Sequence, residues 1–241
     1  MHIRADHAEL DVGVLQDFIR TYPFGQLTTS IKSDHGPTIQ VSHMPFLLDA
    51  GTDGSPGVLR AHMARANPQA KILREAAAAS PNFTLEDEIL IMFQSPVNAY
   101  VTPNFYVATK PDTGKVVPTW DYAAVQVYGK IKVLAENDEA AGTFLSQQLD
   151  DLTDLLEGRA PHENKWKVSD APERYTELLK KAIIGLEIKI DRIEGRFKLS
   201  QEMADGDWSG VVKGFAALGT PEGLTMSKMV AERGKSRNIK V

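Results

Sequence analysis

Hydrophobic and polar residues alternate along several short stretches of the first 134 residues. An alternation with a period of two is typical of a strand that buries one face. Pro45 lies inside one of these stretches and is expected at a sheet edge or a bulge. The pattern predicts strands over residues 24–31, 38–49, 57–62, 88–94 and 123–134.

Capping residues mark where helices begin. Asp11 precedes an apolar helical face that runs to Tyr22-Pro23, and Asn67 is followed by Pro68, a pair that suits a helix start. After Leu134 the apolar spacing becomes about 3.6, as in an amphipathic helix. Further helices are predicted over 136–158, 172–183, 207–217 and 221–233, and a strand with alternating apolar and charged residues over 183–201.

The order of these elements predicts the fold class. Strands follow one another without alternating regularly with helices, which favours an antiparallel barrel over repeated βαβ units. We therefore expect a mainly β protein with added helices (α+β). A chain of 241 residues suits one domain over 1–241, with helical additions at about 136–182 and 207–233.

Composition narrows the possible functions. The chain has no cysteine, which excludes a disulfide framework, a thiolate nucleophile and a zinc–thiolate site. Its net charge of −5 argues against direct DNA binding, which depends on basic surfaces. The polar N-terminus is unlike a signal peptide and no apolar run is long enough to span a membrane. We expect a cytoplasmic protein, with a nuclear location left open for a regulatory role.

A long connection rich in aromatic residues joins the strands predicted at 88–94 and 123–134. Disordered linkers are poor in aromatic residues, so this connection is interpreted as an ordered loop that lines a pocket or a partner surface. An aromatic loop that only covers a sheet edge is the alternative. Its aromatic residues are Tyr100, Phe105, Tyr106, Trp120 and Tyr122.

A phosphate site is one hypothesis for the segment HMARANPQAK. A strand that ends at a helix N-terminus presents free N–H groups, and nearby cations suit an anion. A helix cap with incidental surface charges explains the segment equally well. The candidate residues are His62, Arg65, Asn67 and Lys71.

Hydroxyl and imidazole groups on two neighbouring strands form a second candidate set. Thr28, Thr29, Ser42 and His43 can donate hydrogen bonds to a polar ligand, although such groups are also common on half-exposed strands. The six histidines show no metal-binding spacing and there is no GxSxG motif, so we expect no metal site and find no hydrolase signature. Trp120 and Tyr122 can stack on a flat heterocycle or pack at a dimer interface.

Several longer strings resemble the PaiB-type FMN-binding split-barrel proteins, and the resemblance runs from about Ile3 to Glu232. The fungal members are the most similar. The strings are HMARANPQ, FQSPVNAYVTPNFY, KVVPTWDYAAVQVYGK, WKVSDAPERY, KKAIIGLEIKIDRIEGRFKLSQ and the GFAALGT region. The resemblance implies a six-stranded antiparallel split β-barrel of the pyridoxamine-phosphate oxidase type. It also implies a homodimer that binds FMN between its subunits.

The same resemblance implies positions for the cofactor. Arg65 and Lys71 would bind the FMN phosphate near His62 and Asn67, while Thr28, Thr29, Ser42 and His43 would face the cofactor. Trp120, Tyr122, Lys198 and Gln201 would complete the cofactor-binding set.

Family members are named negative transcriptional regulators. The implied function is therefore a flavoprotein with a regulatory or redox role. An FMN-dependent oxidoreductase is one form that a redox role could take. No catalytic residue is assigned. A cofactor-free enzyme, with Asp121 or His62 as acid or base, or a small-molecule sensor that uses the same pocket is the alternative.

Four positions depart from the family pattern: Asn98, Asp121, Gln126 and Glu202. A negative charge beside a phosphate or a reduced flavin weakens binding unless it faces away. These departures lower the expected affinity for FMN and leave the expected fold unchanged, and a pocket adapted to another ligand explains them equally well.

Overall fold

The computed structural model describes residues 2–51, 54–135, 138–237 and 239. Contacts group the chain into two compact units. Unit 1 comprises Met1–Asp11, Gln94–Val125 and Glu194–Val241, and unit 2 comprises Val12–Phe93 and Gln126–Ile193. Two long strands, β8 (Thr119–Leu134) and β9 (Ile183–Lys198), continue from one unit into the other along the chain.

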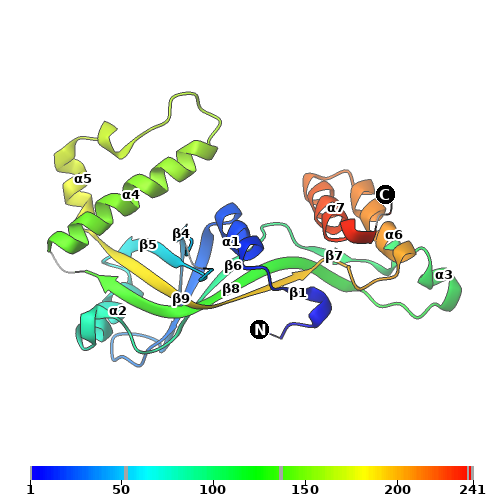
Figure 1. Ribbon diagram of the computed structural model, residues 1–241, viewed down its shortest axis with the longest axis horizontal. Coiled ribbons are helices and arrows are strands. Elements are labelled where there is room, and N and C mark those ends of the chain that lie inside the picture. The colour runs from blue at the N-terminus through cyan, green and yellow to red at the C-terminus, as the bar shows by residue number, and fades with distance from the viewer. Residues whose placement is uncertain (1, 52–53, 136–137, 238, 240–241) are drawn as a thin grey trace. The chain divides into compact units, whose positions relative to one another are not determined.

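Unit 2 is built on a curled antiparallel sheet, a half-barrel, as the alternating pattern predicted (Figure 1). The strand order is β3-β2-β6-β8-β9-β5-β4. Six strands of the structure have six residues or more, and β4 (Leu47–Asp49) is a short addition. The long ones are β8, β9, β2 (Phe24–Ser30), β3 (Ile39–Pro45), β5 (Val58–Ala64) and β6 (Ile89–Gln94).

The residues that alternate inward along these strands form the core of unit 2. Leu27, Leu59, Ile91 and Ile188 are fully buried. Burial of aliphatic and aromatic side chains supplies the main stabilisation, about 25 cal/mol for each Å² of apolar surface removed from water.

Close strand packing requires glycine at position 129. A Cβ at that position would collide with the backbone carbonyl oxygen of Lys189 on β9. The backbones approach too closely there for any side chain on β8.

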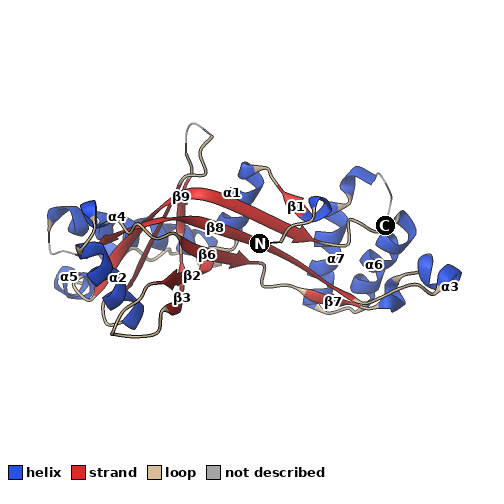
Figure 2. Cartoon of the chain, turned by 90° about the horizontal axis from the view of Figure 1, so that it is seen from below, coloured by secondary structure: helices blue, strands red, loops and turns tan. Residues whose placement is uncertain are grey.

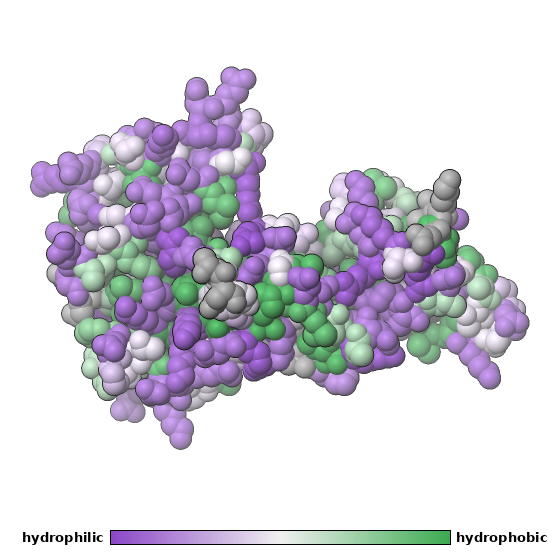
Figure 3. Space-filling view, viewed as in Figure 1, coloured by the Kyte–Doolittle hydropathy of each residue, from purple (hydrophilic) through white to green (hydrophobic). Residues whose placement is uncertain are grey.

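Three helices pack on this sheet: α1 (Val12–Thr21), α2 (Pro68–Ala78) and α4 (Glu139–Arg159). A fourth helix, α5 (Glu173–Lys180), contacts α4 and buries none of its own residues. The Phe144 ring of α4 lies against Gly185 of β9, where a Cβ would collide with it. Arg60 of β5 pairs with Asp49 at 2.6 Å and with Asp151 of α4 at 2.7 Å, which fastens α4 to the sheet. The α4 and α5 part of the surface is mainly hydrophilic (Figure 3).

Unit 1 contains the aromatic connection and the C-terminal helices. The short strand β7 (Ala99–Val101) pairs with the start of β8, and β1 (Ala8–Glu9) pairs with the end of β9. Helices α6 (Asp205–Ala217) and α7 (Pro221–Arg233) lie side by side (Figure 1). The connection also holds a 3-10 turn, η3 (Pro103–Phe105), and the short helix α3 (Thr109–Thr113). Two further 3-10 turns in this unit are η1 (Ala5–His7) and η5 (Lys235–Arg237).

The strand predicted over 38–49 is divided into β3 and β4, because Pro45 has no N–H to continue the ladder and Phe46 turns inward against Phe93. β8 starts at Thr119, four residues before the predicted strand at 123, because β7 supplies a pairing partner there. Residues 136–137 of the predicted helical addition at 136–182 lie outside the described residues. Among those that are described, no helix is long and apolar enough to cross a membrane.

Candidate functional site

The start of α2 joins three of the candidate residues in unit 2. Oδ1 of Asn67 accepts the N–H of Gln69 at 2.9 Å, and its Nδ2 donates to Oγ of Ser42 at 3.0 Å. Nε2 of Gln69 in turn donates to Oγ1 of Thr29 at 2.9 Å. The predicted cap is therefore present, and Thr29, Ser42 and Asn67 are connected through one hydrogen-bonded group.

Strand register separates other candidates from this group. Leu27 pairs with Ser42, so Ser42 shares the core-facing side of the hairpin, whereas Gln26 pairs with His43 and Thr28 with Val41 on the opposite side. His43 is exposed and stacks on Phe24, with ring centroids 6.2 Å apart. Thr28 and His43 thus face away from the side on which Asn67 and Thr29 lie.

His62 lies on the sheet face covered by α4. It pairs with Gly185, which contacts Phe144 of α4, while its neighbours Ala61 and Met63 point into the core. Burial lowers the pKa of His62, so the imidazole is neutral near pH 7. Its Nδ1 is buried and makes no hydrogen bond to the described residues.

The two candidate phosphate cations have different environments. The guanidinium of Arg65 donates to the backbone oxygens of Ala135 at 2.9 Å, Lys181 at 3.2 Å and Ile183 at 3.3 Å. These bonds fasten the end of β5 to the start of β9. Lys71, on the first turn of α2, is exposed, and within the described part of the chain its ammonium group makes no ion pair. Lys71 is therefore the more accessible cation of the pair.

Unit 1 holds the other four candidates. Trp120 is half exposed and its Nε1 donates to Oδ1 of Asn98 at 2.9 Å. The ring of Tyr122 lies 5.6 Å below the guanidinium carbon of Arg196. The side chain of Gln201 bonds to backbone groups, accepting from the N–H of Leu199 at 2.7 Å and donating to the oxygen of Asp6 at 2.9 Å and to that of Phe197.

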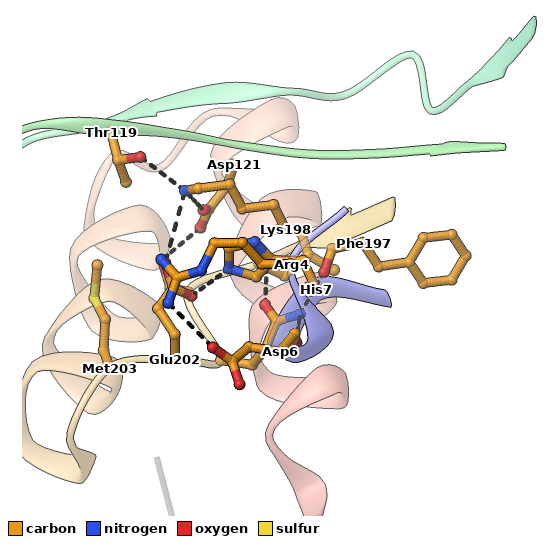
Figure 4. Close-up of polar contacts among 12 residues, drawn as sticks. Arg4, Asp6, His7, Thr119, Asp121, Phe197, Lys198, Glu202 and Met203 are labelled. Atoms are coloured by element: carbon orange, nitrogen blue, oxygen red, sulfur yellow. Dashed lines mark hydrogen bonds and ion pairs between the residues drawn. The ribbon is translucent and has the colours of Figure 1, made fainter. Parts of the chain in front are cut away.

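Lys198 is the centre of a polar cluster in unit 1 (Figure 4). Its ammonium group donates to Oγ1 of Thr119 at 2.7 Å and to the oxygen of Trp120 at 3.0 Å. It lies 3.6 Å from Oδ1 of Asp121 and 3.9 Å from Oε1 of Glu202. One lysine therefore compensates two carboxylates.

Asp121 is completely buried in this cluster. Burial raises the pKa of its carboxyl group to about 6, an effect opposed by the hydrogen bond from Ser200 and by the charge of Lys198. For Glu202, burial acts in the same direction, but hydrogen bonds from its own N–H and from His7 and the charge of Lys198 outweigh it and lower the pKa. Nε2 of His7 lies 3.1 Å from Oε2 of Glu202.

The four departures from the family pattern each have a partner within the protein. Asn98 bonds to Trp120, Asp121 to Ser200, and Glu202 contacts His7 and Lys198. Oε1 of Gln126 accepts from the hydroxyl of Tyr128 at 3.0 Å. The carboxylate of Asp121 is buried, with Ser200 and Lys198 as its neighbours.

Sequence reasoning gave no role to His7 or Ser200. His7 lies outside the quoted strings, and Ser200 lies within KLSQ but was not singled out. They reach Glu202 and Asp121 through the pairing of β1 with β9 and the turn after β9. Tyr106 was named in the aromatic connection that was expected to line a pocket, without an individual role. Within the described residues no group of three or more His, Asp or Glu side chains is arranged to hold a metal ion.

Comparison with known proteins places this arrangement in a family. An uncharacterized protein of Aspergillus fumigatus is 49% identical over 263 residues and each chain is covered completely. The protease synthase and sporulation protein PAI 2 of Bacillus subtilis is 27% identical over 224 residues, with 92% of each chain covered.

Among solved structures, the flavocytochrome Anf3 of Azotobacter vinelandii has a TM-score of 0.51 at 12% identity, covering 86% of this chain and 78% of that one, a likeness of fold. The family model described as "Putative FMN-binding domain" matches residues 1–192. The chain belongs to this FMN-binding family, as its strings and its half-barrel indicated.

Proposed function

We propose that this protein is a flavoprotein that binds FMN and has a regulatory or redox role. The family match over residues 1–192 carries the proposal. The half-barrel supports it, because this sheet is the scaffold that the family resemblance implies. When bound, FMN supplies reversible one- or two-electron transfer, and the protein supplies binding and electrostatics.

The donors in unit 2 fit an anionic phosphate. Lys71 offers an exposed ammonium group on the first turn of α2, and the partial positive charge of a helix N-terminus favours an anion. Ser42 and Asn67 lie at the same helix start and are joined by a hydrogen bond. We propose that Lys71 binds the phosphate and that Asn67 positions the first turn.

The other candidates are proposed flavin contacts of a different kind. The half-exposed ring of Trp120 is held by Asn98 and is suited to stacking on a flat heterocycle. His43 and Thr28 present polar groups on the exposed side of the β2–β3 hairpin. Lys198 and Gln201 are engaged with protein groups, so their proposed role is to position neighbouring segments.

A homodimer is also proposed. β3 ends the strand order, and a sheet edge offers unpaired backbone groups to another strand. Apolar side chains are exposed on this hairpin: Phe24 at 61%, Ile39 at 66% and Val41 at 48%. A second copy of the chain would remove this surface from water.

A titration with FMN tests the cofactor proposal. We expect purified protein to retain flavin absorbance after FMN has been added and free FMN removed by gel filtration. The unfolding temperature should rise with FMN, because a ligand that binds only the folded state stabilises it. Lys71→Ala should weaken FMN binding about tenfold, the loss of one charged phosphate contact. Lys213→Ala is the matched control, because Lys213 is an exposed lysine on α6. Unchanged stability at saturating FMN would refute the proposal.

The alternative function is a cofactor-free enzyme or sensor. The buried, neutral imidazole of His62 and the raised pKa of Asp121 to about 6 are the observations that favour it. Both groups are enclosed by protein, so the flavoprotein is the better supported proposal.

A direct regulatory role would require binding to DNA, which the net charge of −5 does not favour. Retention of promoter DNA by the protein at moderate salt would support that role.

A further inference from the structure

A cavity of about 360 Å³ lies in unit 1, and its lining contains none of the residues named above as FMN contacts. Its walls come from the segment that leads into β8 and from the turn between β9 and α6. We call it the α6 cavity, and the residues that matter to it are Tyr106, Val116, Val117, Pro118, Glu202 and Asp207.

Tyr106 is the first observation that indicates a ligand. Its side chain is buried, with 5% of the residue exposed, and it lines the cavity. Its hydroxyl group has no hydrogen-bond partner among the described residues. The hydroxyl oxygen is nevertheless not sealed from solvent. A phenol in such a position ordinarily finds a partner, so the hydroxyl is available to a molecule in the cavity.

The phenol stays neutral at physiological pH. Burial, together with the negative charges of Asp121, Glu202 and Asp207, raises the pKa of Tyr106 to about 12. A neutral hydroxyl oxygen can accept a hydrogen bond from a cationic donor.

Glu202 supplies the charge. Its Oε2 is 3.1 Å from Nε2 of His7, whereas its Oε1 is 3.9 Å from the ammonium group of Lys198, too far for a hydrogen bond. The side chain of Glu202 is 21% exposed, and Figure 4 shows it beside Met203 at the turn after β9. Oε1 therefore accepts no hydrogen bond from Lys198, and Glu202 is one of the residues that line the cavity.

Asp207 adds negative potential but has little free capacity. Its Oδ1 accepts the N–H groups of Ala108 at 2.8 Å and of Thr109 at 3.1 Å, which fixes the start of α3. Two carboxylates beside the cavity disfavour an anion, and Lys115 is the one cationic side chain of the described lining. No group of three or more metal-ligating side chains occurs in the described residues, so the chemistry does not favour a metal ion.

The remaining walls are apolar. Val116, Val117 and Pro118 precede β8, and Val117 is 74% exposed. An apolar group bound in the cavity would remove part of this surface from water.

We propose that the α6 cavity binds a small organic ammonium ion with an apolar body, whose N–H groups donate to Oε1 of Glu202 and to the hydroxyl oxygen of Tyr106. The apolar body lies against Val116, Val117 and Pro118. This site requires no flavin and stands whether or not FMN binds the protein.

Butylammonium chloride is the probe, and its titration is followed by NMR chemical shifts and calorimetry on the full chain. A ligand of this size is expected to bind with a Kd of about 1 mM. Glu202→Gln should raise the Kd at least about tenfold, since it removes the charge, and Tyr106→Phe about threefold. Asp112→Asn, on the exposed surface of α3, is the control and should leave the Kd unchanged.

Two matched probes separate charge from apolar binding. Sodium butyrate and 1-butanol share the apolar body, and both should bind more weakly than butylammonium. If either binds equally well, if butylammonium gives no saturable shift, or if both variants bind it normally, the proposal is wrong. Tyr106→Phe keeps the test decisive where Glu202→Gln loses the His7 contact and unfolds.

Discussion

Ser200 donates a hydrogen bond of 2.7 Å from its hydroxyl to Oδ2 of Asp121, and both residues are completely buried. Ser200 has a φ of 58°, a conformation that residues other than glycine rarely adopt. The turn after β9 holds this backbone in place and thereby presents the hydroxyl to the carboxylate. A buried carboxylate is costly unless it is paired and hydrogen-bonded. Lys198 and Ser200 offset only part of this cost, because Oδ1 of Asp121 is buried and has no hydrogen bond within the described residues.

The stability of the protein should depend on pH through Asp121. In the folded state the pKa is about 6, above the ordinary value of 3.8, so between these values the folded protein holds a proton that the unfolded chain has lost. The contribution of Asp121 to the free energy of unfolding is therefore greatest at low pH. It falls as the pH rises from 3.8 to about 6, by at most about 3 kcal/mol in total.

Asp121→Asn tests this linkage, because an amide keeps the acceptor for Ser200 and does not titrate. Urea unfolding of both proteins from pH 4 to pH 7 should show wild type losing about 2 kcal/mol relative to the variant. Parallel pH profiles would show that the pKa of Asp121 is not raised.

Lys198→Met should destabilise the protein strongly. The Lys198 side chain is 13% exposed, and its ammonium group compensates the negative charges of Asp121 and Glu202. Its loss therefore leaves a buried carboxylate unpaired. The expected loss in unfolding free energy is about 3 kcal/mol. Adding Asp121→Asn should restore much of it, since the unpaired charge is then absent. Additive losses in the double variant would mean that the two side chains are not coupled.

The alternating pattern was sufficient to predict the half-barrel, because each strand buries one face and the period of two is visible in the sequence. The helix cap at Asn67 was also predictable, because a cap depends only on residues that are adjacent in the sequence. The contacts of Lys198 with Asp121 and Thr119 were not predictable, because they depend on which strands pair and in what register. Arg65 was proposed as a phosphate ligand from its charge, its place beside a helix N-terminus and the family resemblance. None of these reveals that its guanidinium donates to three backbone oxygens.

Arg65→Ala should lower stability rather than FMN affinity. Its guanidinium donates to the backbone oxygens of Ala135, Lys181 and Ile183, and these lose their donors in the variant. The expected loss is about 2 kcal/mol in urea unfolding, with FMN affinity of the folded protein changed less than about threefold. Lys71→Ala, which removes an exposed cation, should show the opposite pattern. A large loss of FMN affinity in Arg65→Ala at unchanged stability would restore Arg65 as a phosphate ligand.

Ile39→Asp should dissociate the proposed homodimer. Ile39 is 66% exposed on the edge strand β3, on the same face as the exposed Val41, so a charge there costs the monomer little but opposes the burial of this surface. Sedimentation equilibrium should show the dimer dissociation constant rising at least about a hundredfold, whereas the unfolding free energy of the monomer changes by less than about 0.5 kcal/mol. Val14→Asp on α1 is the matched control, since Val14 is 42% exposed and lies outside the hairpin. If Ile39→Asp and wild type sediment alike as dimers, the interface uses another surface, and if wild type is a monomer at every concentration, the dimer proposal is wrong.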